Sequence, residues 1–397
     1  MGKKYVSMNK YLIVLLESRH RSFCYYEIPE NTEKKVISWE NLQQVVGFYQ
    51  EYNVPLTFVY GESELPSDYV QLIETVEHVK IFPHGYPKEM EGIRVLEPGD
   101  NPELSISENE TLPPIILKID KSRLEFFSEA VENMSGGFSR MNLILRGLET
   151  FQEDDFIRYF KVLNQAVSKI PRIFQTFGEK EISCLTDRIV LKEMNNCDAG
   201  VRHLTLAPNG RLYICPGFYY AYPDEELGTL DSFEVPNEQL YRLDHAPICL
   251  ECDAFHCKRC VFLNRKITGE VNTPGREECV ASHVERKGSE MLASKLNPQA
   301  EANPIPPIDY LDPFEKYAKK RNINSPHIRY TSLEAALEFP SLPEDPRQGT
   351  EKEARSGKKP IDRKRDKEII KKVYDMQSKI LTMQEEILDL LKYIRGK

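Results

Sequence analysis

Residues 197–215 read CDAGVRHLTLAPNGRLYIC, residues 249–260 read CLECDAFHCKRC, and one more cysteine follows at position 279. The intervals are C-x12-G-x4-C, then C-x2-C-x4-C-x2-C, then x18-C, so seven of the nine cysteines lie in this stretch. A gap of two residues lets both thiolates of one tight turn reach a single metal centre. The spacing therefore predicts that this part of the chain folds around metal.

The second group of cysteines predicts two metal centres. Two C-x2-C pairs only four residues apart would crowd one tetrahedral site, because paired zinc knuckles are usually separated by roughly 15–20 residues. We therefore expect Cys257 and Cys260 to bind different centres. The alternatives are disulfides or ordinary buried thiols. The odd number of cysteines, the regular pairs and the lack of a visible secretory signal favour metal ligation in a reducing, cytoplasmic setting.

The first group of cysteines flanks a predicted hairpin. Its strands are His203–Leu206 and Leu212–Cys215, and Pro208-Asn209-Gly210 forms the turn between them. Such a hairpin would bring the thiols of Cys197 and Cys215 close together.

The order and number of these cysteines resemble the SPASM domain of radical SAM peptide maturases, which holds two auxiliary 4Fe-4S clusters. The resemblance implies that Cys249, Cys252, Cys257 and Cys279 hold one cluster. It implies that Cys197, Cys215 and Cys260 hold the other, with an open fourth position or with Cys184 filling it. Two spacings, Cys252 to Cys257 and Cys257 to Cys260, are each one residue shorter than the family's, so zinc is an alternative metal.

Residues 11–170 alternate apolar runs with amphipathic stretches, which predicts an α/β fold with a parallel sheet. The expected strands are Tyr11–Leu16, Pro55–Tyr60, Val79–Phe82, Pro114–Ile119 and Met141–Leu145. The expected helices are Trp39–Tyr52, Asp68–Glu77, Ser122–Asn133 and Asp154–Lys169. The resemblance implies a partial (β/α) barrel of radical SAM type, whereas the periodicity alone also allows a doubly wound sheet.

Radical SAM enzymes carry CxxxCxxC in the loop after the first strand, and here that first loop (residues 18–30) reads SRHRSFCYYEIPE. Cys24 is its single cysteine, and one thiol does not hold a 4Fe-4S cluster. S-adenosylmethionine is therefore not expected as a cofactor. Among known families, the combination resembles the CXXX repeat peptide maturase group over about residues 1–290. Those proteins are paired with small peptides of repeated Cys-x-x-x units.

Composition narrows the partners. The net charge of −9 argues against nucleic acid as a partner, and no apolar run approaches the roughly 18 residues of a membrane span.

Several residues near the motifs are expected to have structural roles rather than catalytic or ligand roles. His203 and His256 are more typical of core residues than of ligands. Tyr219, Tyr220 and Tyr222 are expected to pack or to shield a cluster. Arg19, His20 and Cys24 are expected in a solvated loop.

The predicted domains are a barrel (1–180), a SPASM-like metal-binding domain (181–292), a Pro-rich linker (293–362) and an amphipathic coiled-coil helix (363–397). The last is predicted from apolar residues that alternate steps of four and three. They are Ile369, Val373, Met376, Ile380, Met383, Ile387, Leu390 and Ile394. This seam predicts self-association or binding to a partner modification protein. The alternative is a helix folded back on the chain's own barrel.

These features together predict a role in maturing a ribosomally made, cysteine-containing precursor peptide. The cysteine-rich domain would position the peptide or relay electrons, and an open ligand position could bind a peptide thiolate. The alternative is a non-catalytic binding or scaffold subunit whose metal centres are structural.

Deletion of residues 365–397 should change the oligomeric state or abolish co-purification of a partner, because the seam buries eight apolar side chains. At about 25 cal/mol per Å² of apolar area, that burial contributes on the order of several kcal/mol after ordering costs. Light scattering and co-purification measure the effect. Unchanged results for the deletion variant would show that the helix packs within the chain.

Overall fold

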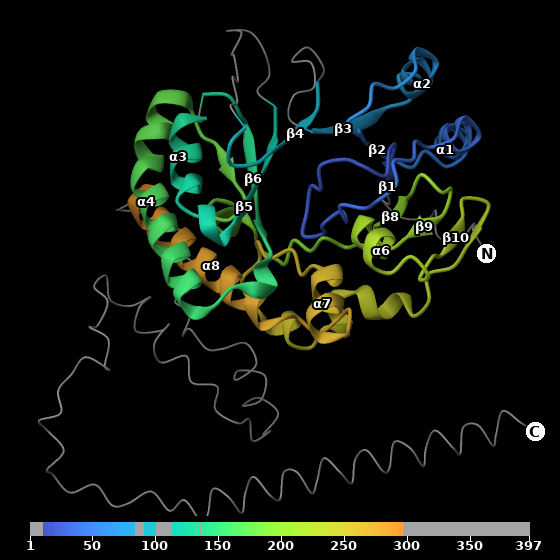
Figure 1. Cartoon of the computed structure of the whole chain (residues 1–397). Coiled ribbons are helices and arrows are strands. Elements are labelled where there is room, and N and C mark those ends of the chain that lie inside the picture. Colours follow the sequence, from blue (N-terminus) through green and yellow to red (C-terminus); the bar gives the residue numbers. More distant parts are fainter. Residues whose placement is uncertain (1–10, 84–90, 101–112, 135, 297–397) are drawn as a thin grey trace, which may run out of the picture. The chain divides into compact units, whose positions relative to one another are not determined.

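The computed structural model describes residues 11–83, 91–100, 113–134 and 136–296, and Figure 1 shows their arrangement. The predicted terminal helix lies outside the described residues, as does the predicted linker apart from residues 293–296. Those four residues end a long helix instead. None of the helices in the described ranges is both long and apolar enough to cross a membrane.

One mixed sheet runs through the described part of the chain in the order β11-β10-β9-β8-β1-β2-β3-β4-β5-β6-β7. Neighbours from β8 through β1 to β7 pair in parallel, and β8 to β11 pair antiparallel. The strands are β1 (Tyr11–Leu15), β2 (Leu56–Val59), β3 (His78–Pro83), β4 (Ile93–Leu96), β5 (Ile115–Asp120), β6 (Arg140–Arg146), β7 (Glu181–Ile182), β8 (His203–Leu206), β9 (Leu212–Tyr213), β10 (Gly228–Thr229) and β11 (Ser232–Phe233). The predicted α/β class with a parallel sheet is confirmed.

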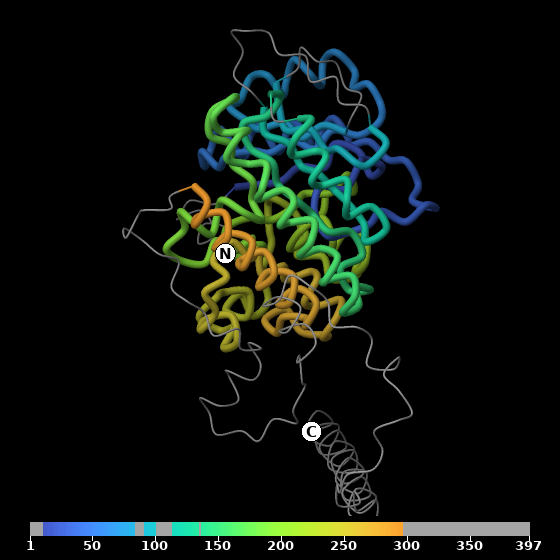
Figure 2. The backbone as a smooth tube through the Cα atoms, turned by 90° about the vertical axis from the view of Figure 1, so that its left-hand side faces the viewer, coloured from blue at the N-terminus to red at the C-terminus, as the bar shows by residue number. Residues whose placement is uncertain are grey.

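Helices join and cover the strands. They are α1 (Trp39–Tyr52), α2 (Ser67–Ile73), α3 (Phe126–Asn133), α4 (Glu153–Phe177), α5 (Asp187–Val190), α6 (Pro216–Ala221), α7 (Val261–Thr268) and α8 (Arg276–Leu296). Local signals set their starts: the Ser38 side chain accepts the Asn41 amide at α1, and Gln152 forms a capping box with Asp155 at α4. Figure 2 shows α3, α4 and α8 packed as one layer.

The two faces of the sheet differ in what covers them. Leu12 and Val14 of β1 pack into the large core on the helix side, whereas Ile13 and Leu15 join a second apolar cluster on the other face. That inner cluster takes one or two residues from each of β1 to β6: Ile13, Leu15, Val59, Ile81, Val95, Ile116 and Ile144. Strands β1 and β5 are four spacings apart, about 19 Å in a flat sheet. Because both line one cavity, the sheet curves around it.

Most predicted elements occur with shifted ends. The hairpin is confirmed as β8 and β9, with β8 paired directly to β1, so the cysteine-rich segment continues the sheet. Helix α4 runs past the predicted end at Lys169 to Phe177, through Pro171. Strand β4 and helix α8 were not predicted, because four residues give little periodicity and α8 has a weakly apolar sequence, REECVASHVERKGSEMLASKL.

Substitution Leu163→Ala should lower the free energy of unfolding by about 2–5 kcal/mol, because it opens a cavity where α4 meets α8. Leu163 is fully buried, and its Cβ lies against the backbone position of Gly288 in α8. Denaturant unfolding measures the change. Lys161→Ala, at an exposed site on the same helix, is the matched control and should alter stability by less than about 0.5 kcal/mol. Equal effects would mean that this contact does not hold the helical layer to the fold.

Candidate metal and substrate site

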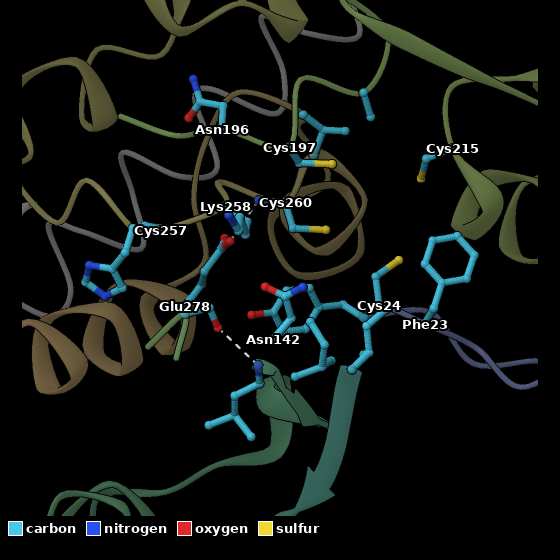
Figure 3. Close-up of a pocket in the computed structure, with 18 of the residues that line it drawn as sticks. Phe23, Cys24, Asn142, Asn196, Cys197, Cys215, Cys257, Lys258, Cys260 and Glu278 are labelled. Carbon is cyan, nitrogen blue, oxygen red and sulfur yellow. Dashed lines mark hydrogen bonds between the residues drawn. The ribbon is translucent and has the colours of Figure 1, made fainter. Parts of the chain in front are cut away.

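A cavity of about 420 Å³ lies against the inner face of the sheet, and Figure 3 shows it. Its walls come from β1, β5 and β6, from the first loop and from the cysteine-rich segment. The apolar wall includes Ile13, Ile116 and Ile144, whereas the opposite wall carries cysteines. The cavity thus places thiols in an environment of low polarity.

Four cysteines share one end of this cavity: Cys24, Cys197, Cys215 and Cys260. Their sulfur atoms point toward the same space in Figure 3. Burial raises the pKa of the Cys24 thiol to about 12, and the nearby Cys197 thiol adds to this rise. Burial likewise raises the pKa of Cys260 and Cys215, with smaller contributions from the other thiols of the group. We call these four residues the cavity thiols.

Local backbone structure holds three of the cavity thiols. Cys215 and Cys260 are the residues before α6 and α7, and the Leu263 amide lies 3.5 Å from the Cys260 sulfur. The Cys197 amide donates to the carbonyl of Lys258 at 2.8 Å, which ties the start of the hairpin to the C-x2-C turn. N–H groups directed at sulfur stabilise thiolates and are a common feature of iron–sulfur ligand loops.

Four further cysteines, Cys249, Cys252, Cys257 and Cys279, line a neighbouring pocket of about 20 Å³, and Cys257 also lines the main cavity. The amides of Ala254 and Arg259 donate to the sulfurs of Cys252 and Cys257, each at 3.4 Å. Burial raises the pKa of Cys249 to about 12, with further contributions from Glu278 and Cys252, and burial also raises the pKa of Cys279, with contributions from the neighbouring thiols. We call these residues the pocket thiols. Cys257 lines both spaces, whereas Cys260 lines the larger one, so the binding of these two cysteines to different centres stays a prediction.

Arg259 lies between the two thiol groups. Its side chain is 1% exposed, and its guanidinium donates to the carbonyl of Tyr241. Burial raises the pKa of both Cys197 and Cys249, and the positive charge of Arg259 opposes that rise at each thiol, after Lys258 at Cys197. The backbone at Arg259 is left-handed, with φ of 43°, a conformation that the surrounding contacts must hold. Arg259 is thus a fixed buried cation that favours thiolates on both sides.

The expectation of a solvated first loop is wrong. His20, Ser22 and Tyr26 are buried, because the aromatic side chains of the loop pack under the sheet and against α6. Tyr220 stacks on Tyr26, with ring centroids 5.6 Å apart, and its hydroxyl donates to the Ser18 carbonyl at 2.7 Å. The aromatic run FCYY at positions 23–26 was the available signal, since four such residues rarely remain in water.

The other end of the cavity is polar. Cys184 lies there beside Tyr159, whose hydroxyl donates to Glu285 at 2.6 Å, and Glu285 lies 3.2 Å from His256 Nε2. Burial raises the pKa of the Cys184 thiol, and the strongest charges acting on it are those of Glu285 and Asp187. Cys184 therefore belongs to a carboxylate–phenol group rather than to the cavity thiols.

The histidines of the motif line the same cavity. His203 stacks on Tyr11 with ring centroids 4.7 Å apart, and burial lowers its pKa to about 4, so the ring is neutral at pH 7. His256 is buried beside Glu285. Tyr219 and Tyr220 pack on the inner apolar cluster, as expected for packing residues. Tyr222 instead packs in the main core beside Phe218 and Phe262.

Within the described ranges, no three His, Cys, Asp or Glu side chains converge closely enough to form a site for a single metal ion. The ligand sulfurs of one tetrahedral zinc ion lie roughly 3.8 Å apart, from Zn–S distances of about 2.3 Å. In a 4Fe-4S cluster, each thiolate binds a different iron atom. Four thiols spread around a cavity fit the second kind of group in number and donor type.

Comparisons with known proteins find similarity to solved structures and none to protein-family models or curated sequences. No protein-family model and no curated protein matches the chain. Among solved structures, it is similar to the crystal structure of Streptococcus suis SuiB bound to precursor peptide SuiA. The identity is 12%, the TM-score is 0.40, and the match covers 68% of this chain and 76% of that one. Another crystal structure of SuiB matches at 12% identity and a TM-score of 0.36, covering 62% and 70% of the two chains. Likeness of this size assigns no residue and no activity.

Substitution Arg259→Met should lower the free energy of unfolding by about 2–4 kcal/mol, because it removes a buried cation and leaves the Tyr241 carbonyl without its donor. Denaturant unfolding of anaerobically purified protein measures it. Arg265→Met is the control, since Arg265 pairs with Glu225 at the surface and should contribute less than about 1 kcal/mol. If Arg259→Met lowers the free energy of unfolding no more than Arg265→Met does, the buried charge of Arg259 does not stabilise the site.

Proposed function

We propose that this chain acts in the maturation of a ribosomally made, cysteine-containing peptide and carries two iron–sulfur groups of SPASM type, without a radical SAM cluster of its own. The observation that carries the proposal is the gathering of eight cysteines around two neighbouring spaces, with Arg259 acting on a thiol of each group. The resemblance of the cysteine spacing to the SPASM domain supplies the link to peptide maturation, and the curved sheet is consistent with a partial (β/α) barrel.

Each thiol group offers what an iron–sulfur cluster needs from a protein. The donors are cysteine sulfurs, apolar side chains exclude water, and backbone amides together with Arg259 offset the negative charge. Cys249, Cys252, Cys257 and Cys279 would hold one cluster, and Cys197, Cys215 and Cys260 would provide ligands to the other. When bound, such clusters supply a site for one-electron transfer.

The side chains that line the cavity could bind the peptide. Two carboxyl groups line the cavity: Glu285 at its polar end, and Glu278, which accepts from the Cys260 amide at 2.8 Å. They can bind a peptide's positively charged or amide groups, because the second Glu278 oxygen is buried without a hydrogen-bond partner. Burial raises the pKa of Glu278 to about 7, so it carries a proton for part of the time near neutrality. The apolar wall can hold an uncharged segment and exclude water.

The alternative is a scaffold subunit whose metal centres are structural. The pocket of about 20 Å³ favours that role for the pocket thiols, since it leaves no room for a substrate beside them. Structural thiolate sites contribute folding free energy, about 10–16 kcal/mol apparent for zinc peptides. Iron with sulfide supports the maturation proposal, whereas zinc without sulfide supports the scaffold.

Anaerobically purified protein should contain about eight iron and about eight sulfide per chain, the content of two 4Fe-4S clusters. Cys252→Ala and Cys215→Ala should each lose about half of that content, because they remove ligands from different groups. The double variant should lose nearly all. Metal and sulfide analysis with visible absorbance measures this. Loss of all iron from either single variant would contradict two independent centres.

The chain alone should not cleave S-adenosylmethionine reductively, since the first loop has one cysteine where that chemistry needs three. The measurement is 5′-deoxyadenosine formed by reconstituted protein with a strong reductant, against a no-protein blank. Product above the blank would contradict the absence of a radical SAM cluster. A partner chain that restores the product would place that cluster on the partner.

A further inference from the structure

We propose that Cys24, the single cysteine of the first loop, is the fourth thiolate ligand of the centre that contains Cys197, Cys215 and Cys260. The inference rests on the proposed function and gives that centre its complete ligand set. It takes the place of the two sequence-based alternatives, an open position and Cys184.

The first argument is geometric. Cys24 lines the same end of the cavity as the other three residues, and its sulfur points into the space that they surround (Figure 3). The four thiols come from four separate segments: the first loop, the residues before β8, and the starts of α6 and α7. Convergence of four distant thiols on one space is unusual for inert core cysteines, which pack singly.

The second argument is the path of the first loop. The loop leaves the carboxyl end of β1 and returns along the inner face of the sheet. Arg21 donates to the Val95 carbonyl of β4 at 3.2 Å, and Ser22 is hydrogen-bonded to Lys118 of β5. Cys24 then reaches Tyr11, the first residue of β1, where both line the cavity. The loop thus carries its cysteine to the opposite end of the strand, beside the cysteine-rich segment.

The third argument is that aromatic and hydrogen-bond contacts of the protein hold the loop in this path. Tyr220 of α6 stacks on Tyr26 and hydrogen-bonds to the Ser18 carbonyl. His20 Nε2 lies 2.7 Å from the Tyr26 hydroxyl. Cys24 is therefore presented by a packed loop, and a thiol held in place loses little conformational entropy on binding.

Cys184 is the matched comparison. It is buried in the wall of the same cavity, but its neighbours are Tyr159 and Glu285, whereas the charge that acts most on Cys24 is that of the Cys197 thiol.

The consequence concerns what the centre does. With Cys24 bound, the protein fills all four positions, so no iron is left open for a peptide thiolate. The centre would join the sheet to the cysteine-rich segment and could relay electrons, while the peptide would bind elsewhere in the cavity. The loop that holds the radical cluster in radical SAM enzymes would here serve the neighbouring centre.

The test compares Cys24→Ala and Cys24→Ser with Cys184→Ala, all purified anaerobically as full-length protein. The readouts are iron, zinc and sulfide per chain, and the electron paramagnetic resonance spectrum after mild oxidation and after reduction. Cys24→Ala should lose between about one and about four of about eight iron atoms, either as a three-iron species or by emptying the centre. Cys24→Ser should retain more iron with an altered spectrum, and Cys184→Ala should match the wild type. Retention of the other four-iron signal in Cys24→Ala shows that the variant is folded.

The outcomes separate this inference from the proposed function. Wild-type protein with zinc and no sulfide overturns the proposed function, yet loss of zinc from Cys24→Ala alone still supports Cys24 as a ligand. If Cys24→Ala has the same metal content and spectra as the wild type, the inference is overturned. The same holds if Cys24→Ala and Cys184→Ala lose equal amounts of metal. Wild-type protein that takes up neither metal overturns both.

Discussion

The burial of thiols that resist ionisation is the constraint on which the site depends. All eight cysteines of the two thiol groups lie in or beside apolar surroundings, where the loss of hydration disfavours a thiolate; for seven of them the pKa is raised. A thiolate becomes favourable there only beside a positive charge. Arg259 provides one fixed charge between the groups, and bound metal would provide the rest. Backbone N–H groups directed at the sulfurs also stabilise thiolates.

The same constraint explains the arrangement of the fold around the cavity. The cysteine-rich segment does not form a separate sheet, because β8 pairs with β1 and extends the parallel ladder. The first loop fills part of the inner face with Phe23 and Tyr25, which join the inner apolar cluster. What remains open is the 420 Å³ space between the sheet and the thiols. The apolar side chains of the sheet thus form one wall of the space that the cavity thiols line.

Local patterns predicted the elements that local forces determine. The turn at Asn209-Gly210 predicted the hairpin, and apolar steps of three and four predicted α1 and α4, since both signals act within a few residues. Short-range crowding predicted that Cys257 and Cys260 bind different centres, and this stays a prediction because Cys257 lines both spaces. Cys24 was not predicted, because its role depends on a loop that returns along the inner face of the sheet, and spacing along the chain carries no information about that return. Tyr220, which holds the loop, lies nearly two hundred residues away.

The most direct test is an anaerobic crystal structure of the full chain with an anomalous difference map recorded at the iron edge. The account predicts two four-iron peaks on either side of Arg259. One peak should be surrounded by Cys24, Cys197, Cys215 and Cys260, and the other by Cys249, Cys252, Cys257 and Cys279. Iron absent from both positions, with single zinc atoms in its place, would contradict the claim that two buried thiol groups hold iron–sulfur clusters.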